Sequence, residues 1–240
     1  MSVINRDTPQ PLYGSPERQA VVPYPEPSAF RVGSLFSGAG GLDLGLHRAG
    51  LQTAWFNEID PAPARILQHA WPHTPLYLCS VSELSGEELV RRHGPVSMIA
   101  GGSPCQGFSA AGLREGLDDH RSGLFSEQIR IWHETKAEFL LWENVVGAFT
   151  SNGGADFTAV LNAFVDAKIP MPKGGWKSAG VAVGNGGVVA WRVLDAQFMG
   201  VPQRRRRVFA LVSRTGLVDP AEVLLEMANP LPLEEAGAAA

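Results

Sequence analysis

The chain has 240 residues, of which 45% are hydrophobic, enough for one domain with a single buried core or at most two domains. Its formal net charge of −4 excludes a protein that attracts nucleic acid through a strongly basic overall composition. The apolar runs are far shorter than the roughly 20 residues that cross a bilayer, and the N-terminus has no signal-peptide pattern. We therefore expect a cytoplasmic protein without a membrane segment.

In chain order, residues 1–30 are rich in proline and poor in large apolar side chains, which predicts a flexible tail. Residues 31–214 form the predicted domain, and residues 215–240 a second tail. Within the domain, short apolar runs alternate with helical periodicity, which predicts an α/β fold, doubly wound around a mainly parallel sheet. The expected strands are Arg31–Phe36, Thr53–Asn57, Val96–Ala100, Phe139–Trp142, Val188–Leu194 and Arg207–Ser213. The expected helices are Leu42–Ala49, Pro61–His69 and Glu127–Thr135. Residues 106–123 and 170–187 are expected to be irregular.

A glycine-rich turn containing Gly38, Gly40 and Gly41 joins the first predicted strand to the first predicted helix. Glycines at such a turn let the backbone approach a ligand and expose helix N-terminal amides to it. Glu58 follows Gly38 by twenty residues, where a carboxylate can bind both ribose hydroxyls. The layout indicates an adenosine-containing cofactor. These glycines are closer together than in the dinucleotide fingerprint, so a tight turn without a ligand stays open.

The chain contains only two cysteines, too few for a disulfide framework or a tetrahedral metal site, and we expect no metal. Cys105 directly follows a predicted buried strand, in Gly101-Gly-Ser-Pro-Cys-Gln-Gly-Phe-Ser109. Because ligands bind at the carboxyl ends of strands in such sheets, we expect its thiol to face a crevice and act as a nucleophile. A small buried hydrophobe is the alternative, and we accept it for Cys79.

Two further motifs lie at strand ends. Glu143 ends an apolar strand at the same predicted edge, where a buried carboxylate can hold a proton for a substrate, although a loop anchor is the alternative. Four arginines, Arg204–Arg207, begin the last strand, and alternation sends Arg205 and Arg207 to one face and their neighbours to the other. A solvated basic surface is the alternative for this run.

The order of these motifs resembles that of the C5-cytosine DNA methyltransferase family over about residues 31–214. The resemblance implies a Rossmann-like domain that binds S-adenosylmethionine. The residues that match its cofactor site are Phe36, Gly38, Gly40, Gly41, Leu42, Glu58, Ile59, Ser80, Val81, Pro104 and Leu124. Those that match its catalytic motifs are Cys105, Glu143, Gln203, Arg205 and Arg207. Ser109, Arg114 and Arg121, on a segment similar to the family's catalytic loop, are the expected DNA contacts.

The resemblance also implies a mechanism. The thiolate of Cys105 adds to carbon 6 of a flipped cytosine, Glu143 stabilises the charge at N3, and Arg205 orients the base. Two departures stand out. Ser80 lies where the family commonly has an acidic residue, and only about 27 residues follow Ser213, where the family continues with a target-recognition domain.

Three explanations for the short C-terminal region are open: a split enzyme whose second polypeptide supplies recognition, a truncated remnant, or a minimal enzyme of low specificity. Methylation of tRNA cytosine and a non-catalytic binding role are the alternative functions.

Overall fold

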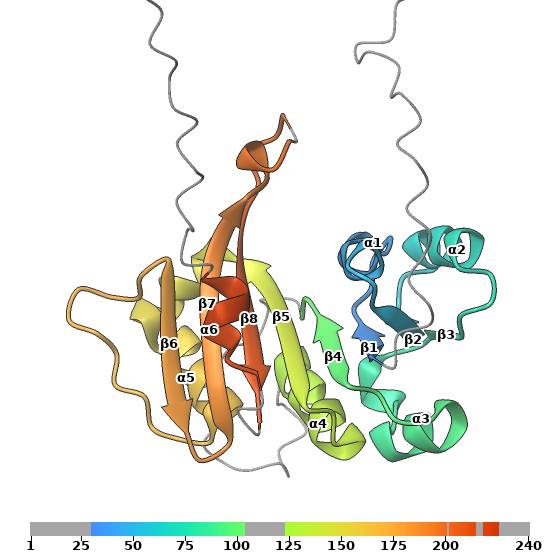
Figure 1. Ribbon diagram of the computed structural model, residues 1–240, viewed down its shortest axis with the longest axis horizontal. Helices are drawn as coiled ribbons and strands as arrows, with labels where there is room; N and C mark the ends of the chain where they lie inside the picture. Colours follow the sequence, from blue (N-terminus) through green and yellow to red (C-terminus); the bar gives the residue numbers. More distant parts are fainter. Residues whose placement is uncertain (1–29, 104–122, 201, 215–217, 226–240) are drawn as a thin grey trace, which may run out of the picture.

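The computed structural model describes residues 30–103, 123–200, 202–214 and 218–225. Within these ranges, eight strands form one sheet with helices on both faces (Figure 1). The strands are β1 Arg31–Leu35, β2 Gln52–Glu58, β3 Leu76–Leu78, β4 Met98–Gly101, β5 Phe139–Val145, β6 Ala179–Gly184, β7 Gly187–Asp195 and β8 Arg206–Ser213. The α-helices are α1 Gly41–Arg48, α2 Pro61–Ala70, α3 Gly86–His93, α4 Leu124–Thr135, α5 Ala155–Val165 and α6 Pro220–Leu224. The 3-10 turns are η1 Val81–Glu83, η2 Val146–Phe149, η3 Ser151–Gly154 and η4 Ala196–Phe198.

The strand order in the sheet is β3-β2-β1-β4-β5-β8-β7-β6. The strands β1 to β5 pair in parallel, while β8, β7 and β6 extend the sheet in antiparallel fashion. The predicted α/β class is confirmed, and all six predicted strands and all three predicted helices are present with boundaries that differ by a few residues. Val96, for example, lies before β4, and α4 begins at Leu124 rather than at Glu127.

The expectation that residues 170–187 are irregular is wrong, because β6 occupies residues 179–184. It forms a hairpin with β7 in which Gly184 pairs with Gly187, leaving Asn185 and Gly186 as the turn. An Asn-Gly pair between apolar residues is a strong hairpin signal. In this hairpin the residue with positive φ is Gly187, at 134°. We expected no strand in residues 170–187 because their composition is rich in glycine.

Alternation along the strands divides the core into two layers. One face of the sheet carries Leu35, Trp55 and Ile99 and packs against α3, α4 and α5. The other carries residues such as Val32, Met98 and Leu141, with α1 and α6 on that side. In Figure 1, α6 lies in front of β7 and β8, and α4 and α5 lie behind the sheet. Full burial of side chains such as Phe157 and Leu140 stabilises the fold by roughly 1.5–3 kcal/mol each.

Two segments outside the predicted elements complete the fold. The helix α5 buries Phe157, Val160, Leu161, Phe164 and Val165 against the sheet. The helix α6 lies within residues 215–240, which we expected to form a tail, and its Leu224 carbonyl accepts a hydrogen bond of 3.1 Å from Arg192 of β7. None of the described helices is long and apolar enough to cross a membrane.

The carboxyl ends of the parallel strands meet at one edge of the sheet. At this edge Leu35 of β1 lies beside Gly101 of β4, and Gly101 lies beside Trp142 of β5. Because β8 is antiparallel to β5, its first residues lie at the same edge, where Arg207 pairs with Val145. The fold thus brings four segments that are distant in sequence to one place.

Candidate active site at the carboxyl edge of the sheet

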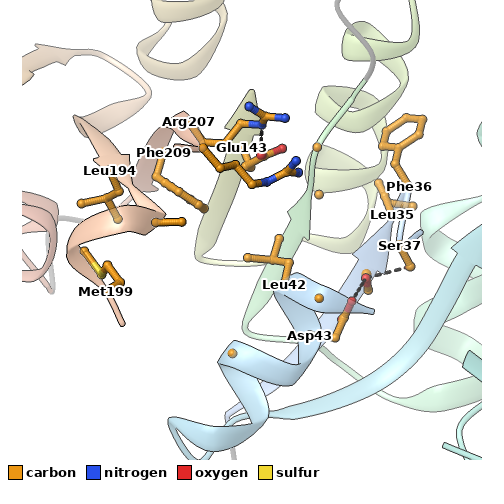
Figure 2. A pocket seen from close by; sticks show the side chains of 17 residues that line it. Leu35, Phe36, Ser37, Leu42, Asp43, Glu143, Leu194, Met199, Arg207 and Phe209 are labelled. Atoms are coloured by element: carbon orange, nitrogen blue, oxygen red, sulfur yellow. Dashed lines mark hydrogen bonds and ion pairs between the residues drawn. The ribbon is translucent and has the colours of Figure 1, made fainter. Parts of the chain in front are cut away.

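A cavity of about 570 Å³ lies at this edge of the sheet. Figure 2 shows Glu143 and Arg207 on one side, Leu42 and Asp43 on another, and Leu194 and Met199 on a third. Residues from β1, the glycine loop, α1, β4, β5, β7 and β8 contribute to its walls: Ser34, Leu35, Phe36, Ser37, Gly41, Leu42, Asp43, Gly45, Gly101, Gly102, Glu143, Leu194, Ala196, Met199, Arg205, Arg207 and Phe209. Three predicted catalytic residues, Glu143, Arg205 and Arg207, therefore share one cavity with the predicted cofactor residues Phe36, Gly41 and Leu42.

The glycine loop leaves β1 through a sharp turn. Phe36, Gly38 and Gly40 all have positive φ, at 52°, 54° and 81°. A Cβ atom at position 40 would lie 2.6 Å from the ring of Trp71, whereas one at position 41 would meet nothing within 4 Å. Gly40 is therefore required by the fold, while Gly41 leaves open space beside the cavity at the start of α1.

Glu58 at the end of β2 is 9% exposed and fixes this loop. Its Oε2 accepts a hydrogen bond of 2.7 Å from the amide of Gly38, and its Oε1 accepts one of 2.8 Å from the amide of Asp60. A carboxylate can accept about four hydrogen bonds, so within the described part of the chain each oxygen keeps one free position. This geometry suits the predicted role of binding a ribose.

The other predicted cofactor residues differ in their surroundings. Ile59 and Leu124 are large apolar side chains left 67% and 37% exposed near the carboxyl edge. Val81 is buried, and the Ser80 hydroxyl accepts a hydrogen bond of 3.3 Å from the Ser82 amide, as the cap of η1. Several predicted cofactor residues do not line the cavity of Figure 2: Gly38, Gly40, Glu58, Ile59, Ser80, Val81 and Leu124. Pro104 lies outside the described residues.

A buried carboxylate in the cavity wall was not predicted from the sequence. Asp43 of α1 is 1% exposed, and its two oxygens accept hydrogen bonds of 3.0 Å from the Ser34 hydroxyl and 3.2 Å from the Thr53 hydroxyl. Burial raises the pKa of Asp43 above its ordinary value, although these two hydrogen bonds oppose the shift. Nothing in the sequence indicated this burial, because an acidic residue of an amphipathic helix is expected on its polar, exposed face.

The Glu143 carboxylate forms an ion pair with Arg207. The distance from Arg207 Nε to Glu143 Oε1 is 3.0 Å, and each side chain is 25% exposed. Arg207 Nη1 also donates to its neighbour's carbonyl at Arg206, over 2.9 Å. Arg205 lines the same cavity with an exposed side chain, whereas Arg204 and Arg206 line a separate cavity, as the strand alternation predicted. Gln203 is exposed and lines neither.

The backbone that leads from β4 toward Cys105 is fixed by three buried side chains. The Gln128 side chain of α4 donates to the Gly101 carbonyl over 3.1 Å. The Trp142 indole donates to the Ser103 hydroxyl over 3.1 Å, and the Asn144 amide donates to the Ser103 carbonyl over 3.0 Å. Cys105, Ser109, Arg114 and Arg121 lie outside the described residues, so their predicted roles stay predictions.

Gly102 brings this backbone against the Glu143 carboxylate. A Cβ atom at position 102 would lie 2.7 Å from Glu143 Oε2. The sequence offered a signal for this contact, since Gly101 and Gly102 directly precede the cysteine motif, but we did not predict a role for either residue. Among the described residues, no group of three or more His, Cys, Asp or Glu side chains could hold a metal ion.

Comparison with known proteins agrees with this geometry. The family model for C-5 cytosine-specific DNA methylase matches residues 30–229. A protein of Escherichia phage P1 named DNA N-6-adenine-methyltransferase is 35% identical over a match that covers 81% of this chain and 30% of that protein. Type II methyltransferase M.AquIA of Picosynechococcus sp. is 35% identical over 76% of this chain and 71% of its own length. For M.XorII of Xanthomonas oryzae pv. oryzae, also 35% identical, the shares are 78% and 41%.

Solved structures share the same architecture. A prophage-encoded E. coli protein named as a DNA modification methyltransferase superposes with a TM-score of 0.59 at 26% identity, covering 79% of this chain and 48% of that one. Spodoptera frugiperda DNMT2 shares the fold, with a TM-score of 0.53 at 20% identity over 79% of this chain and 51% of that one. The chain thus spans about half of these structures, with the Rossmann-like fold of methyltransferases that use S-adenosylmethionine. Together with the motifs around the cavity, the family match shows that this chain belongs to the C-5 cytosine-specific DNA methylase family.

Proposed function

We propose that this chain is the cofactor-binding and catalytic part of a DNA methyltransferase that modifies carbon 5 of cytosine through a covalent adduct of Cys105. The observation that carries the proposal is the shared cavity, in which the glycine loop faces the Glu143–Arg207 pair. Ser103, two residues before Cys105, accepts hydrogen bonds from Trp142 and Asn144, the two neighbours of Glu143 in β5.

The proposed cofactor is S-adenosylmethionine, which when bound supplies an electrophilic methyl group. The residues present fit it: Glu58 keeps free acceptor positions for ribose hydroxyls, and the exposed side chains of Ile59 and Leu124 offer apolar surface for the adenine ring. Gly41 and Leu42 line the cavity beside the first turn of α1. Helix N-terminal amides favour a negatively charged group, such as the carboxylate of the methionine part.

The chain's own residues then account for the activation of cytosine. Carbon 5 of cytosine is a weak nucleophile, so the Cys105 thiolate adds to carbon 6 and makes carbon 5 enamine-like. Glu143 hydrogen-bonds or protonates N3 as charge develops in the ring, and Arg205 orients the base at its carbonyl oxygen. Arg207 holds the Glu143 carboxylate in place through the 3.0 Å ion pair. After methylation, carbon 5 loses its proton and the thiolate is expelled from carbon 6.

A cytosine can reach this cavity only when it is rotated out of the duplex, at a cost of a few kcal/mol. We propose that Ser109, Arg114 and Arg121 contact the DNA around the flipped base. We further propose that a second polypeptide supplies target recognition, because base-specific readout needs side chains in the major groove. In support, the chain spans 41% of M.XorII but 71% of M.AquIA, so the relatives include both long and short chains.

The name of the phage P1 relative raises a second candidate, methylation of adenine at N6. An exocyclic amine attacks a methyl donor directly and needs no cysteine adduct, so the Cys105 motif favours cytosine. The chain covers 30% of that relative, and a name given to the whole protein does not assign the chemistry of the matched part. Methylation of tRNA cytosine is the other alternative.

The test is the identity of the methylated base. The chain is incubated with labelled S-adenosylmethionine and either duplex DNA or tRNA, alone and with the product of the neighbouring gene, and the nucleosides are separated by mass spectrometry. We expect 5-methylcytosine in DNA. N6-methyladenine, or 5-methylcytosine only in tRNA, would contradict the proposal.

A further inference from the structure

A second cavity, of about 450 Å³, lies on the other face of the hairpin that joins β7 to β8. It shares Leu194 and Met199 with the proposed active-site cavity, so the two hollows lie on either side of the same hairpin. In Figure 1 this hairpin extends beyond the other strands at the top of the sheet, the edge at which β5 ends. The remaining residues of its wall are Ser178, Arg192, Val193, Asp195, Gln197, Phe198, Arg204 and Arg206.

The charge of this second cavity is positive. Among the residues that the structure describes, three arginines line it and one carboxylate, that of Asp195. The Asp195 carboxylate is used by the hairpin itself, since it accepts hydrogen bonds from the backbone amides of Gln197 and Arg205, each over 3.2 Å. It therefore stabilises the turn, and its single negative charge offsets only one of the three arginine charges.

Arg204 and Arg206 are the exposed members of the set. Arg192 donates to the Leu224 carbonyl, but the structure gives neither Arg204 nor Arg206 a side-chain hydrogen bond or ion pair within the residues it describes. A guanidinium group binds a phosphate through two parallel hydrogen bonds, and phosphate is its preferred partner where no carboxylate is present.

The position of these two arginines relates them to the active site. Arg206 directly precedes Arg207, whose ion pair with Glu143 marks the proposed base-binding wall. Neighbouring side chains of a strand point to opposite faces, so Arg206 lies on the face of the hairpin opposite to Arg207. A base held beside Arg207 would bring its sugar-phosphate backbone close to this hairpin. DNA presents one phosphate per roughly 3.4 Å along each strand, close enough for flanking phosphates to meet the opposite face. Phe198, 81% exposed beside these arginines, adds an aromatic surface that nucleotides can contact.

We infer that Arg204 and Arg206 form a phosphate-binding face for the DNA backbone next to the flipped cytosine. The inference rests on the proposed function, and it adds two residues outside the motif that matches the family's catalytic arginines. Because the whole chain carries a net charge of −4, affinity for DNA depends on such local cations.

The test is the salt dependence of DNA binding. Fluorescence anisotropy with a duplex of arbitrary sequence gives the slope of log Kd against log salt for the wild type and for Arg204→Gln/Arg206→Gln. Each lost phosphate contact reduces this slope by about 0.9, so the double variant is expected to lose about 1.8 and to bind about tenfold or more weakly at low salt. The matched control is Lys136→Gln/Lys168→Gln, which removes two exposed charges at the opposite edge of the sheet and should keep the slope.

A slope unchanged in the arginine variant, an equal loss in the lysine control, or no DNA binding by the wild type would overturn the inference. Loss of binding to a partner polypeptide, with an unchanged slope for DNA, would overturn it in favour of a protein-docking surface. The slope is measured without methyl transfer, so its outcome is separate from that of the proposed function. A wild type that binds DNA with the predicted slopes but forms no 5-methylcytosine would contradict only the latter.

Discussion

Glu143 and Arg207 face each other across the antiparallel pair of β5 and β8, with Arg207 Nε 3.0 Å from Glu143 Oε1. Arg207 belongs to β8, the antiparallel neighbour of β5, and lies at the carboxyl edge where the parallel strands end. The pair links two motifs that are 64 residues apart and gives the cavity both an acceptor and a donor for a planar base.

Replacing Glu143 with Gln should lower the rate of methyl transfer by about 10²–10⁴-fold, because the amide can hydrogen-bond to N3 but cannot transfer a proton to it. Each member of the pair is 25% exposed, so the free energy of unfolding should change by no more than about 1 kcal/mol. Glu87→Gln, an exposed position on α3, is the control and should keep full activity. Single-turnover methylation assays measure the effect, and a rate within threefold of the wild type would exclude this role for Glu143.

Replacing Gly102 with Ala should displace the Glu143 carboxylate, because the new Cβ would lie 2.7 Å from Oε2. A misplacement of about 1 Å can reduce a catalytic rate by about 10²-fold, and we expect a loss of this order with little change in thermal stability. Gly147→Ala provides a matched control, since its Cβ would make an ordinary contact of 3.8 Å with Val145. Equal activities of the two variants would show that the Gly102 contact does not position Glu143.

The glycine loop offers a pair of variants with opposite expectations. Gly40→Ala should destabilise the fold by about 1 kcal/mol or more, because position 40 has φ of 81° and its Cβ would lie 2.6 Å from Trp71. Gly41→Ala has open space in the structure and should keep the stability, yet weaken cofactor binding because Gly41 lines the cavity. Calorimetry with S-adenosylmethionine separates the two effects, and unchanged cofactor affinity in Gly41→Ala would argue against binding at this wall.

Asp43 predicts a pH dependence of stability. Burial raises the pKa of Asp43 above its ordinary value of 3.8, so the folded state favours the protonated carboxyl. As the pH rises above 3.8, the unfolded chain ionises first, and the folded state loses stability until the pH passes the raised pKa. The variant Asp43→Asn lacks this titration. Its free energy of unfolding should therefore improve relative to the wild type as the pH rises from 3.8 to the raised pKa of Asp43.

Urea denaturation at several pH values measures this difference. The Thr53 hydroxyl donates a hydrogen bond to Asp43, and this bond lowers the pKa of the carboxyl group. Thr53→Val removes the bond, so the pKa of Asp43 should rise further and the loss of stability should extend to higher pH. A constant difference between the wild type and Asp43→Asn would mean that Asp43 does not titrate in this range.

The sequence predicted the parts of the fold whose pattern is local. Strands such as β4 are short apolar runs followed by glycine, and their succession with helices predicted the parallel sheet in which β4 and β5 end at the same edge. The hairpin of β6 and β7 escaped prediction, because the Asn185-Gly186 turn lies in a stretch where glycines also occur for other reasons.

Side-chain contacts between distant segments were the least predictable. The alternation of Arg204–Arg207 followed from strand geometry, and the structure places the two pairs along different cavities. The burial of Asp43, the approach of Gly102 to Glu143 and the anchoring of Ser103 by Trp142 all depend on tertiary packing, which no spacing in a single sequence specifies.

The most direct test of the central claim is a trapping experiment with DNA that contains 5-fluorocytosine. Fluorine at carbon 5 cannot leave as a proton does, so the thiolate stays attached to carbon 6 after methylation. We predict a covalent complex with the wild type in the presence of S-adenosylmethionine, the same complex with Cys79→Ala, and none with Cys105→Ala. A complex that persists in Cys105→Ala, or none from the wild type with or without the neighbouring gene product, would contradict Cys105 as the nucleophile.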